Sequence, residues 1–312
     1  MTYIEFEELI VNKIKGKLPN EEVIVRSITK NNSVNLRGLV ILNEDKRISP
    51  SIYLESFFES YKKGQDIDDL VEEILELYNE QDGQVVFDPE SYKDINRIRD
   101  KVLYKLINFE RNEELIENLP HRRFLDFAVV YYVIVDCDSQ GTGSILIRNE
   151  HLDFWNVNEE DLYSFACANT YKEMPHEIVS MSDIINEILD ENNGEYEDIV
   201  RDIIPEETDE DENVIKMYVM TNLKRINGAV TMLYEGALKE FANKIVKNLY
   251  ILPSSVHELV VVPDVCGADK KALYNIVREA NEECVSAEEW LSDNVYYYDR
   301  NKDEISIVDI DK

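Results

Sequence analysis

The longest apolar run of the chain, residues 124–135, constrains the fold more than any other stretch. Its β-branched and aromatic residues are nearly continuous, which is typical of a strand covered on both faces, although a buried helix of this length would show the same pattern. The run is too short to cross a bilayer, and Asp126 interrupts it. We therefore predict that residues 120–136 form the central strand of a sheet.

The composition favours a globular protein with an acidic surface. The chain has 312 residues, of which 44% are hydrophobic, and this is enough for two domains and a sizeable core. Its formal net charge is −32. Such a surface repels nucleic-acid phosphates and anionic membranes, so we expect neither direct nucleic-acid binding nor membrane association.

The cysteines and the N-terminus favour a cytoplasmic location. The four cysteines lie far apart and include no Cys-x-x-Cys pair, which excludes a zinc ribbon and a thioredoxin-like motif. They are Cys137, Cys167, Cys266 and Cys284. The N-terminus has no basic segment that leads into an apolar one, as a secretory signal would. We expect a cytoplasmic protein with reduced thiols.

The first part of the chain predicts a small α+β domain over residues 1–82. Thr2 and Glu5 have the spacing of a capping box, and an amphipathic helical pattern follows them. Residues 23–28 and 34–42 are β-rich runs that predict a hairpin, and residues 48–54 predict a third strand. Two helical segments follow, of which the first ends near Gly64.

The second part predicts a larger α+β domain over residues 90–312. Strand patterns follow one another directly as often as they alternate with helical patterns, which favours mostly antiparallel sheets over a doubly wound fold. The predicted strands are residues 102–108, 120–136, 144–148, 214–221, 249–252, 257–262, 295–298 and 305–308. Helices are predicted to begin at Asn158 and Ser182, and around residues 238–246 and 273–280.

An acidic insertion is predicted at about 190–213. Residues 187–213 contain thirteen acidic residues and one basic residue, Arg201. Low hydrophobicity and self-repulsion predict a loop with few apolar anchors. The simplest interpretation is a solvated insertion without function, and the sequence does not tell whether the stretch is functional.

The motifs of common enzyme classes are absent from the sequence. It contains no glycine-rich phosphate loop, no His-Glu-x-x-His and no Gly-x-Ser-x-Gly. Active sites are often assembled from isolated residues, so these absences lower the expectation of an enzyme without excluding one. We predict no cofactor, no metal ligand and no catalytic residue.

Three compact polar groups lie beside apolar strands and form the candidate binding site. They are His121, Arg122 and Arg123; Arg148, Asn149 and His151; and Ser254, Ser255 and His257. If the strands share a sheet, the groups could meet at one end, where the three arginines would suit a small anion or a carboxylate. Metal ligation would require histidines and carboxylates from different groups to converge. The alternative is that these side chains satisfy turn backbones and neutralise nearby acids.

Several segments resemble an uncharacterised bacterial family, domain of unknown function 5688, found in Firmicutes. The likeness covers nearly the whole chain and is carried by residues 105–112, 120–126, 145–151, 249–258 and 291–296. The acidic stretch is longer than this family leads us to expect. The resemblance implies a cytoplasmic bacterial protein and assigns no catalytic residue.

Three functional hypotheses remain open. The first is a soluble α+β protein that acts by binding another protein. The second is an enzyme or small-anion binder that uses the three polar groups. The third is an acidic nucleic-acid mimic, which requires carboxylates in rows at roughly phosphate spacing. The sequence does not identify the partner or the oligomeric state.

Overall fold

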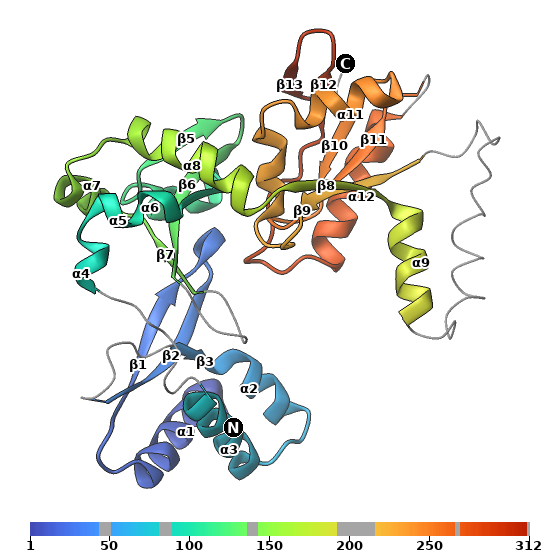
Figure 1. Ribbon diagram of the computed structural model, residues 1–312. Coiled ribbons are helices and arrows are strands. Elements are labelled where there is room, and N and C mark those ends of the chain that lie inside the picture. The colour runs from blue at the N-terminus through green and yellow to red at the C-terminus, as the bar shows by residue number, and fades with distance from the viewer. Residues whose placement is uncertain (44–50, 81–88, 136–142, 192–215, 266–268, 311–312) are drawn as a thin grey trace. The chain divides into compact units, whose positions relative to one another are not determined.

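A computed structural model describes residues 1–43, 51–80, 89–135, 143–191, 216–265 and 269–310 (Figure 1). The fold is α+β with antiparallel sheets, as predicted. The chain divides into two compact units, which are Met1–Ile98 with Val133–Ile145, and Arg99–Tyr132 with Leu146–Lys312. The domain boundaries predicted from the sequence, 1–82 and 90–312, stay a prediction. The acidic insertion lies outside the described residues beyond Glu191.

The first unit begins with a helix, continues with a three-stranded sheet and ends with further helices. Its elements are α1 (Tyr3–Lys17), β1 (Glu22–Thr29), η1 (Asn31–Ser33), β2 (Asn35–Leu42), β3 (Ser51–Tyr53), α2 (Leu54–Lys62), α3 (Ile67–Glu80), α4 (Pro89–Tyr92) and α5 (Ile95–Ile98). The sheet has the order β1-β2-β3. The apolar faces of α1, α2 and α3 pack with the sheet into one core cluster, so the predicted helix, meander and two helices are confirmed.

Local polar contacts explain where α1 begins and how it is held. Thr2 and Glu5 form the predicted capping box, which satisfies two backbone N–H groups at the helix start. Lys13 Nζ lies 2.5 Å from Asp68 on α3, and Lys17 pairs one turn further along with Glu72. The buried apolar faces of α1 and α3 therefore meet with a short row of ion pairs beside them.

A four-stranded sheet and its helices come next in the chain, and most of their residues belong to the second unit. Its elements are η2 (Arg99–Lys101), β4 (Val102–Asn108), η3 (Glu110–Asn112), α6 (Glu113–Ile116), β5 (His121–Phe124), β6 (Phe127–Val135), β7 (Gly143–Leu146), α7 (Asn149–Trp155) and α8 (Glu159–Glu173). The order is β4-β6-β5, and β7 also pairs with β6. β7 corresponds to the strand that the sequence predicts over residues 144–148.

The prediction of one central strand over residues 120–136 was wrong, because the chain turns within it. β5 and β6 form an antiparallel hairpin in which Phe124 pairs with Phe127. Leu125, at the turn, has a φ of 55°, which is unusual for a leucine. Residues 127–133 are buried, as expected for a strand covered on both faces.

A six-stranded antiparallel sheet forms the rest of the second unit. Its elements are β8 (His176–Ser180), α9 (Met181–Glu191), β9 (Tyr218–Asn222), η4 (Gly228–Leu233), α11 (Ala237–Ile245), β10 (Leu249–Pro253), β11 (Leu259–Pro263), α12 (Lys270–Glu283), β12 (Tyr296–Asp299) and β13 (Glu304–Ile307). The strand order is β13-β12-β10-β11-β9-β8.

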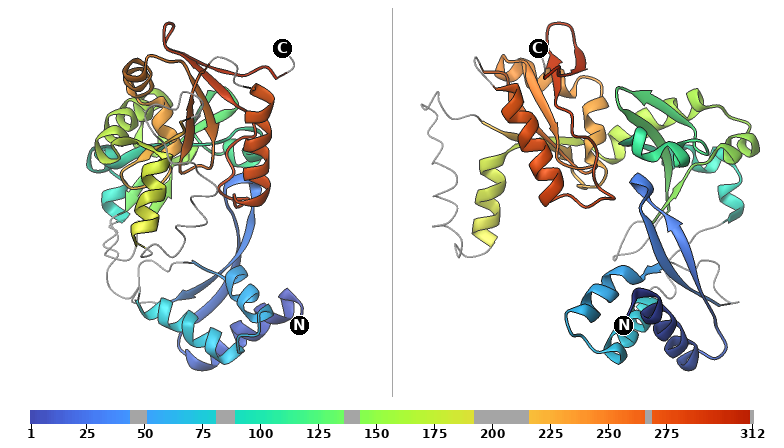
Figure 2. Two further views of the ribbon diagram at one scale, coloured as in Figure 1. Left: turned by 90° about the vertical axis from the view of Figure 1, so that its right-hand side faces the viewer. Right: turned by 180° about the vertical axis from the view of Figure 1, so that it is seen from behind.

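Helices cover both faces of the six-stranded sheet. α12 packs on one face through Leu273 and Val277, which contact apolar residues of β10 and β11 (Figure 2). Phe241 of α11 packs edge-to-face on Tyr218, on the other face. Among the residues described, no helix has the length and apolar character needed to cross a membrane.

The residue that ends α11 predicts a stabilising substitution. Val246 has a φ of 58° and an exposed side chain, although a β-branched residue is strained in the left-handed region. We expect Val246→Gly to raise the free energy of unfolding by about 1 kcal/mol, measured by chemical denaturation. Val246→Ala retains the Cβ and is the control. An equal gain in both variants would show that left-handed strain is not the cause.

Candidate functional site

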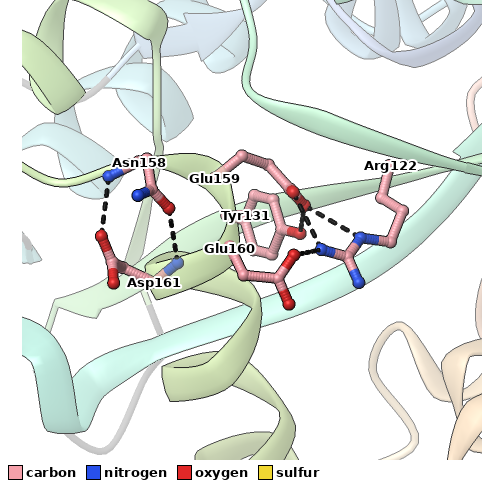
Figure 3. A network of polar contacts seen from close by, with 6 residues as sticks. All are labelled: Arg122, Tyr131, Asn158, Glu159, Glu160 and Asp161. Carbon is pink, nitrogen blue, oxygen red and sulfur yellow. Dashed lines mark hydrogen bonds and ion pairs between the residues drawn. The ribbon is translucent and has the colours of Figure 1, made fainter.

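Arg122 of β5 is held by two carboxylates at the start of α8 (Figure 3). Its Nη2 donates to Glu159 Oε2 at 3.0 Å and to Glu160 Oε2 at 2.6 Å, and its Nε donates to Glu159 Oε1 at 3.3 Å. The guanidinium also lies 3.8 Å from the ring centre of Tyr163. The hydrogen bonds to Glu159 raise the pKa of Arg122 above its ordinary value. The Nε and Nη2 donors of Arg122 are thus bound by carboxylates of the protein itself.

The start of α8 fixes the position of these carboxylates. Asn158 and Asp161 form a capping box, seen on the left of Figure 3, so Glu159 and Glu160 lie in the first turn, where the helix dipole favours negative charge. The Tyr131 hydroxyl donates to Glu159. Burial and this contact raise the pKa of Tyr131, so the hydroxyl remains a donor at neutral pH.

His121 and Arg123 lie on the opposite face of β5 from Arg122, since successive side chains of a strand alternate. Both lie against Phe109: the His121 ring is 6.0 Å from the Phe109 ring, and the Arg123 guanidinium is 4.3 Å from it. His121 Nδ1 donates to Leu119 O at 3.0 Å, and Arg123 Nε donates to Leu125 O at 3.1 Å. The two adjacent arginines therefore do not form one anion fork.

The second polar group surrounds the start of α7 and contacts the segment that precedes β5. Asn149 donates through its backbone N to Asn118 O and through Nδ2 to Glu117 O, both at 3.0 Å. The His151 Nδ1 accepts from the Arg148 backbone N–H at 3.1 Å. Burial lowers the pKa of His151, which favours the neutral ring. The structure thus brings this group near the first one.

The third polar group belongs to the turn between β10 and β11, in the six-stranded sheet. The Ser254 Oγ donates to Glu258, and the Ser255 Oγ accepts from the His257 backbone N–H at 3.0 Å. His257 Nδ1 accepts from the Asn227 backbone N–H, and its Nε2 lies 3.6 Å from Glu289. These contacts stabilise the turn and belong to a different sheet from the first two groups.

A fourth polar group, which sequence reasoning missed, centres on Asp126 in the β5–β6 turn. Asp126 Oδ1 accepts from the Tyr296 hydroxyl at 2.6 Å, and Oδ2 accepts from Ser292 Oγ at 2.7 Å and from Asn294 Nδ2 at 3.0 Å. Burial, followed by the Asp126 charge, raises the pKa of Tyr296 far above its ordinary value. No short-range signal could have revealed this group, because its members lie 166 to 170 residues apart.

The edge of the six-stranded sheet at β8 combines an unpaired strand side with exposed apolar residues. Among the described strands, β8 pairs only with β9, and all five of its side chains are half-buried. Exposed apolar side chains lie near both of its ends, and they belong to Tyr171, Met217, Leu223 and Ile226. The Leu223 backbone bonds to Pro175, and the Met217 carbonyl accepts from Met181, which places them beside the strand.

Metal-binding geometry is not found in the part of the chain that the structure describes. There, no three or more side chains of histidine, cysteine, aspartate or glutamate are arranged to hold a metal ion. The described cysteines, Cys167 and Cys284, are free thiols.

The contrast between the two arginines of β5 gives a direct stability test. We expect Arg122→Lys to lower the free energy of unfolding by about 1 kcal/mol, because lysine retains the charge and loses the planar fork. Arg123→Lys is the matched control, since Arg123 has no carboxylate partner among the described residues, and we expect a smaller loss. Denaturation midpoints measure both. A larger loss for Arg123→Lys would contradict the structural role of Arg122.

Comparison with known proteins identifies the family and assigns no activity. No curated protein matches the chain, and no solved structure matches it. A family model described as a family of unknown function, DUF5688, matches residues 3–300. This match covers nearly the whole chain, including all four polar groups and β8. The chain therefore belongs to the family of unknown function DUF5688.

Proposed function

We propose that this protein acts by binding an extended segment of another protein along the free edge of β8. The proposal rests on the position of β8 at the edge of the six-stranded sheet. Within the described residues, β8 has one paired side and one unpaired side, with exposed apolar side chains at both ends. Alternate N–H and C=O groups of an edge strand point away from its neighbour and are available to a further strand.

Strand addition explains how such an edge would give both affinity and selectivity. The main-chain hydrogen bonds of the added strand supply sequence-independent affinity, and neighbouring apolar surfaces select its side chains. Leu223 and Ile226 lie beyond the end of β9 that is paired with the start of β8. An apolar residue of the partner would pack against them.

The charge of the chain favours a basic partner. With a net charge of −32, the protein attracts cationic proteins over long range, and this attraction weakens as salt screens it. A cytoplasmic location is part of the proposal, and the free thiols of Cys167 and Cys284 support it. The interaction would not require catalytic residues.

The proposal predicts that a charge beside β8 disrupts the complex. We expect Leu223→Asp to weaken binding of the partner that copurifies with the wild-type protein by about tenfold or more, since the aspartate would be desolvated at an apolar contact. The side chain of Leu223 is 62% exposed, so the free protein should remain folded. Titration of the purified partner measures the affinity.

Ile4→Asp is the matched control, because the side chain of Ile4 is 68% exposed and lies in the first unit. This variant should bind like the wild type. Hydrogen exchange provides a second readout, in which the amides of β8 should become protected only when the partner is bound. Unchanged affinity of Leu223→Asp together with unprotected β8 amides would refute binding at this edge.

A further inference from the structure

The hydrogen bonds at the two ends of β8 show which backbone groups of the strand point away from the sheet. β8 pairs with β9 in an antiparallel register. The Leu223 N–H donates to Pro175 O just before β8, and the Met181 N–H donates to Met217 O just after it. In an antiparallel pair, residues that bond to the neighbouring strand alternate with residues whose N–H and C=O groups point away. Pro175 and Met181 lie an even number of residues apart, so the same alternation continues through β8.

His176 and Ile178 therefore direct their N–H and C=O groups away from β9, whereas Glu177 and Val179 bond to it. Among the described strands, none pairs with β8 on that outer side, and in Figure 1 the strand runs from α8 to α9. The backbone hydrogen bonds of turns and loops in the described chain include none from His176 or Ile178. These two residues supply the main-chain groups that an added strand would use.

An aromatic surface lies beside β8 on the face that carries the side chains of His176 and Ile178. The His176 ring lies 6.1 Å from the ring of Tyr171 on α8 and 6.2 Å from the ring of Tyr234. Tyr234 is buried, whereas the side chain of Tyr171 is 50% exposed. An apolar side chain on this face of an added strand could therefore pack against Tyr171.

The opposite face of β8 carries a carboxylate. The Glu177 side chain lies on that face, because successive side chains of a strand alternate. Its Oε1 lies 3.8 Å from Arg225 Nε, and the side chain of Arg225 is 64% exposed. Such a long, exposed pair contributes little, so the Glu177 carboxylate can also pair with a cation of the partner.

We infer that the segment bound along β8 carries alternating apolar and basic residues; the inference rests on the proposed function. Its apolar side chains lie on the face of His176 and Tyr171, and its basic side chains lie on the face of Glu177. This arrangement follows because the side chains of an added strand alternate, and side chains directly opposite each other share a face. A second copy of this chain fits poorly, since two chains with a net charge of −32 repel each other.

The test uses synthetic peptides of about seven residues, a usual length for a strand, and the full chain. In the first peptide lysine and leucine alternate. The second has the same composition, with the lysines and the leucines in separate blocks, and in the third serine replaces lysine. We expect the alternating lysine–leucine peptide to bind at least about fivefold more tightly than the block peptide, and about threefold more tightly than the serine–leucine peptide, in fluorescence anisotropy titrations.

Variants of the two faces test which side chains of the peptide they contact. Glu177→Gln should weaken binding of the lysine–leucine peptide by about threefold and leave that of the serine–leucine peptide unchanged. Tyr171→Ser should weaken binding of both by about threefold, because both carry leucines. The matched controls are Glu279→Gln on α12 and Phe154→Ser on α7, where the Phe154 side chain is 51% exposed. Neither control should change the affinity.

Hydrogen exchange separates this inference from the proposed function. In the free protein the amides of His176 and Ile178 should exchange faster than those of Glu177 and Val179, and the lysine–leucine peptide should slow the first pair. The inference is overturned if the block peptide binds as tightly as the alternating one, or if Glu177→Gln and Tyr171→Ser both bind like the wild type. Protection of the β8 amides by the copurified partner would then still support binding at this edge, and its absence would reject the proposed function itself.

Discussion

The carboxylate of Asp126 is the contact on which the second unit depends. It lies in the β5–β6 turn of one sheet and accepts hydrogen bonds from Ser292, Asn294 and Tyr296, which lie just before or at the start of β12 in the other sheet. Hydrogen bonds to an ionised acceptor are roughly twice as strong as those between neutral groups. The neighbouring rings of Phe127 and Tyr296, 5.1 Å apart, add apolar contact at the same point. The two sheets are therefore joined by the hydrogen bonds of Asp126 and by the adjacent contact between two aromatic rings.

Several basic side chains of this acidic protein are used to hold its elements together. Arg37 forms two hydrogen bonds with Glu7, Lys13 pairs with Asp68, and Arg122 binds the first turn of α8. Exposed pairs contribute little individually, but the half-buried fork of Arg122 fixes a helix on a sheet. With 65 acidic residues and 33 basic ones in the chain, the internal use of cations leaves carboxylates in excess at the surface. This excess is consistent with the proposed basic partner.

Local signals were sufficient to predict much of the fold. The capping boxes at Thr2 and Asn158 marked the starts of α1 and α8, and polar turns marked most hairpins. The β5–β6 hairpin was missed because its turn is formed by Leu125 and Asp126, without the glycine or asparagine that usually marks such a turn. The order of strands in the six-stranded sheet, and hence the place of β8 at its edge among the described strands, depends on pairings that no local pattern shows.

The candidate site was predicted only in part. The sequence located the polar groups at strand ends, and the structure brings the first two near each other. In the structure, the side chains of Arg122 and Arg123 lie on opposite faces of β5, because successive side chains of a strand alternate. The third group belongs to another sheet. Asp126 had been noted only as an interruption of an apolar run. The hydrogen-bond partners of Asp126 come after α12 in the sequence, so only the folded structure shows which groups this carboxylate contacts.

A double-mutant cycle between Asp126 and Tyr296 tests the central claim that this network joins the two sheets. Asp126→Asn, Tyr296→Phe and the double variant are compared with the wild type by chemical denaturation. Each single variant should lose part of the free energy of unfolding. The sum of the two single losses should exceed the loss of the double variant by about 1–3 kcal/mol, because each single change removes the same contact. Losses that add within about 0.3 kcal/mol would show that the residues are not coupled and would contradict the account.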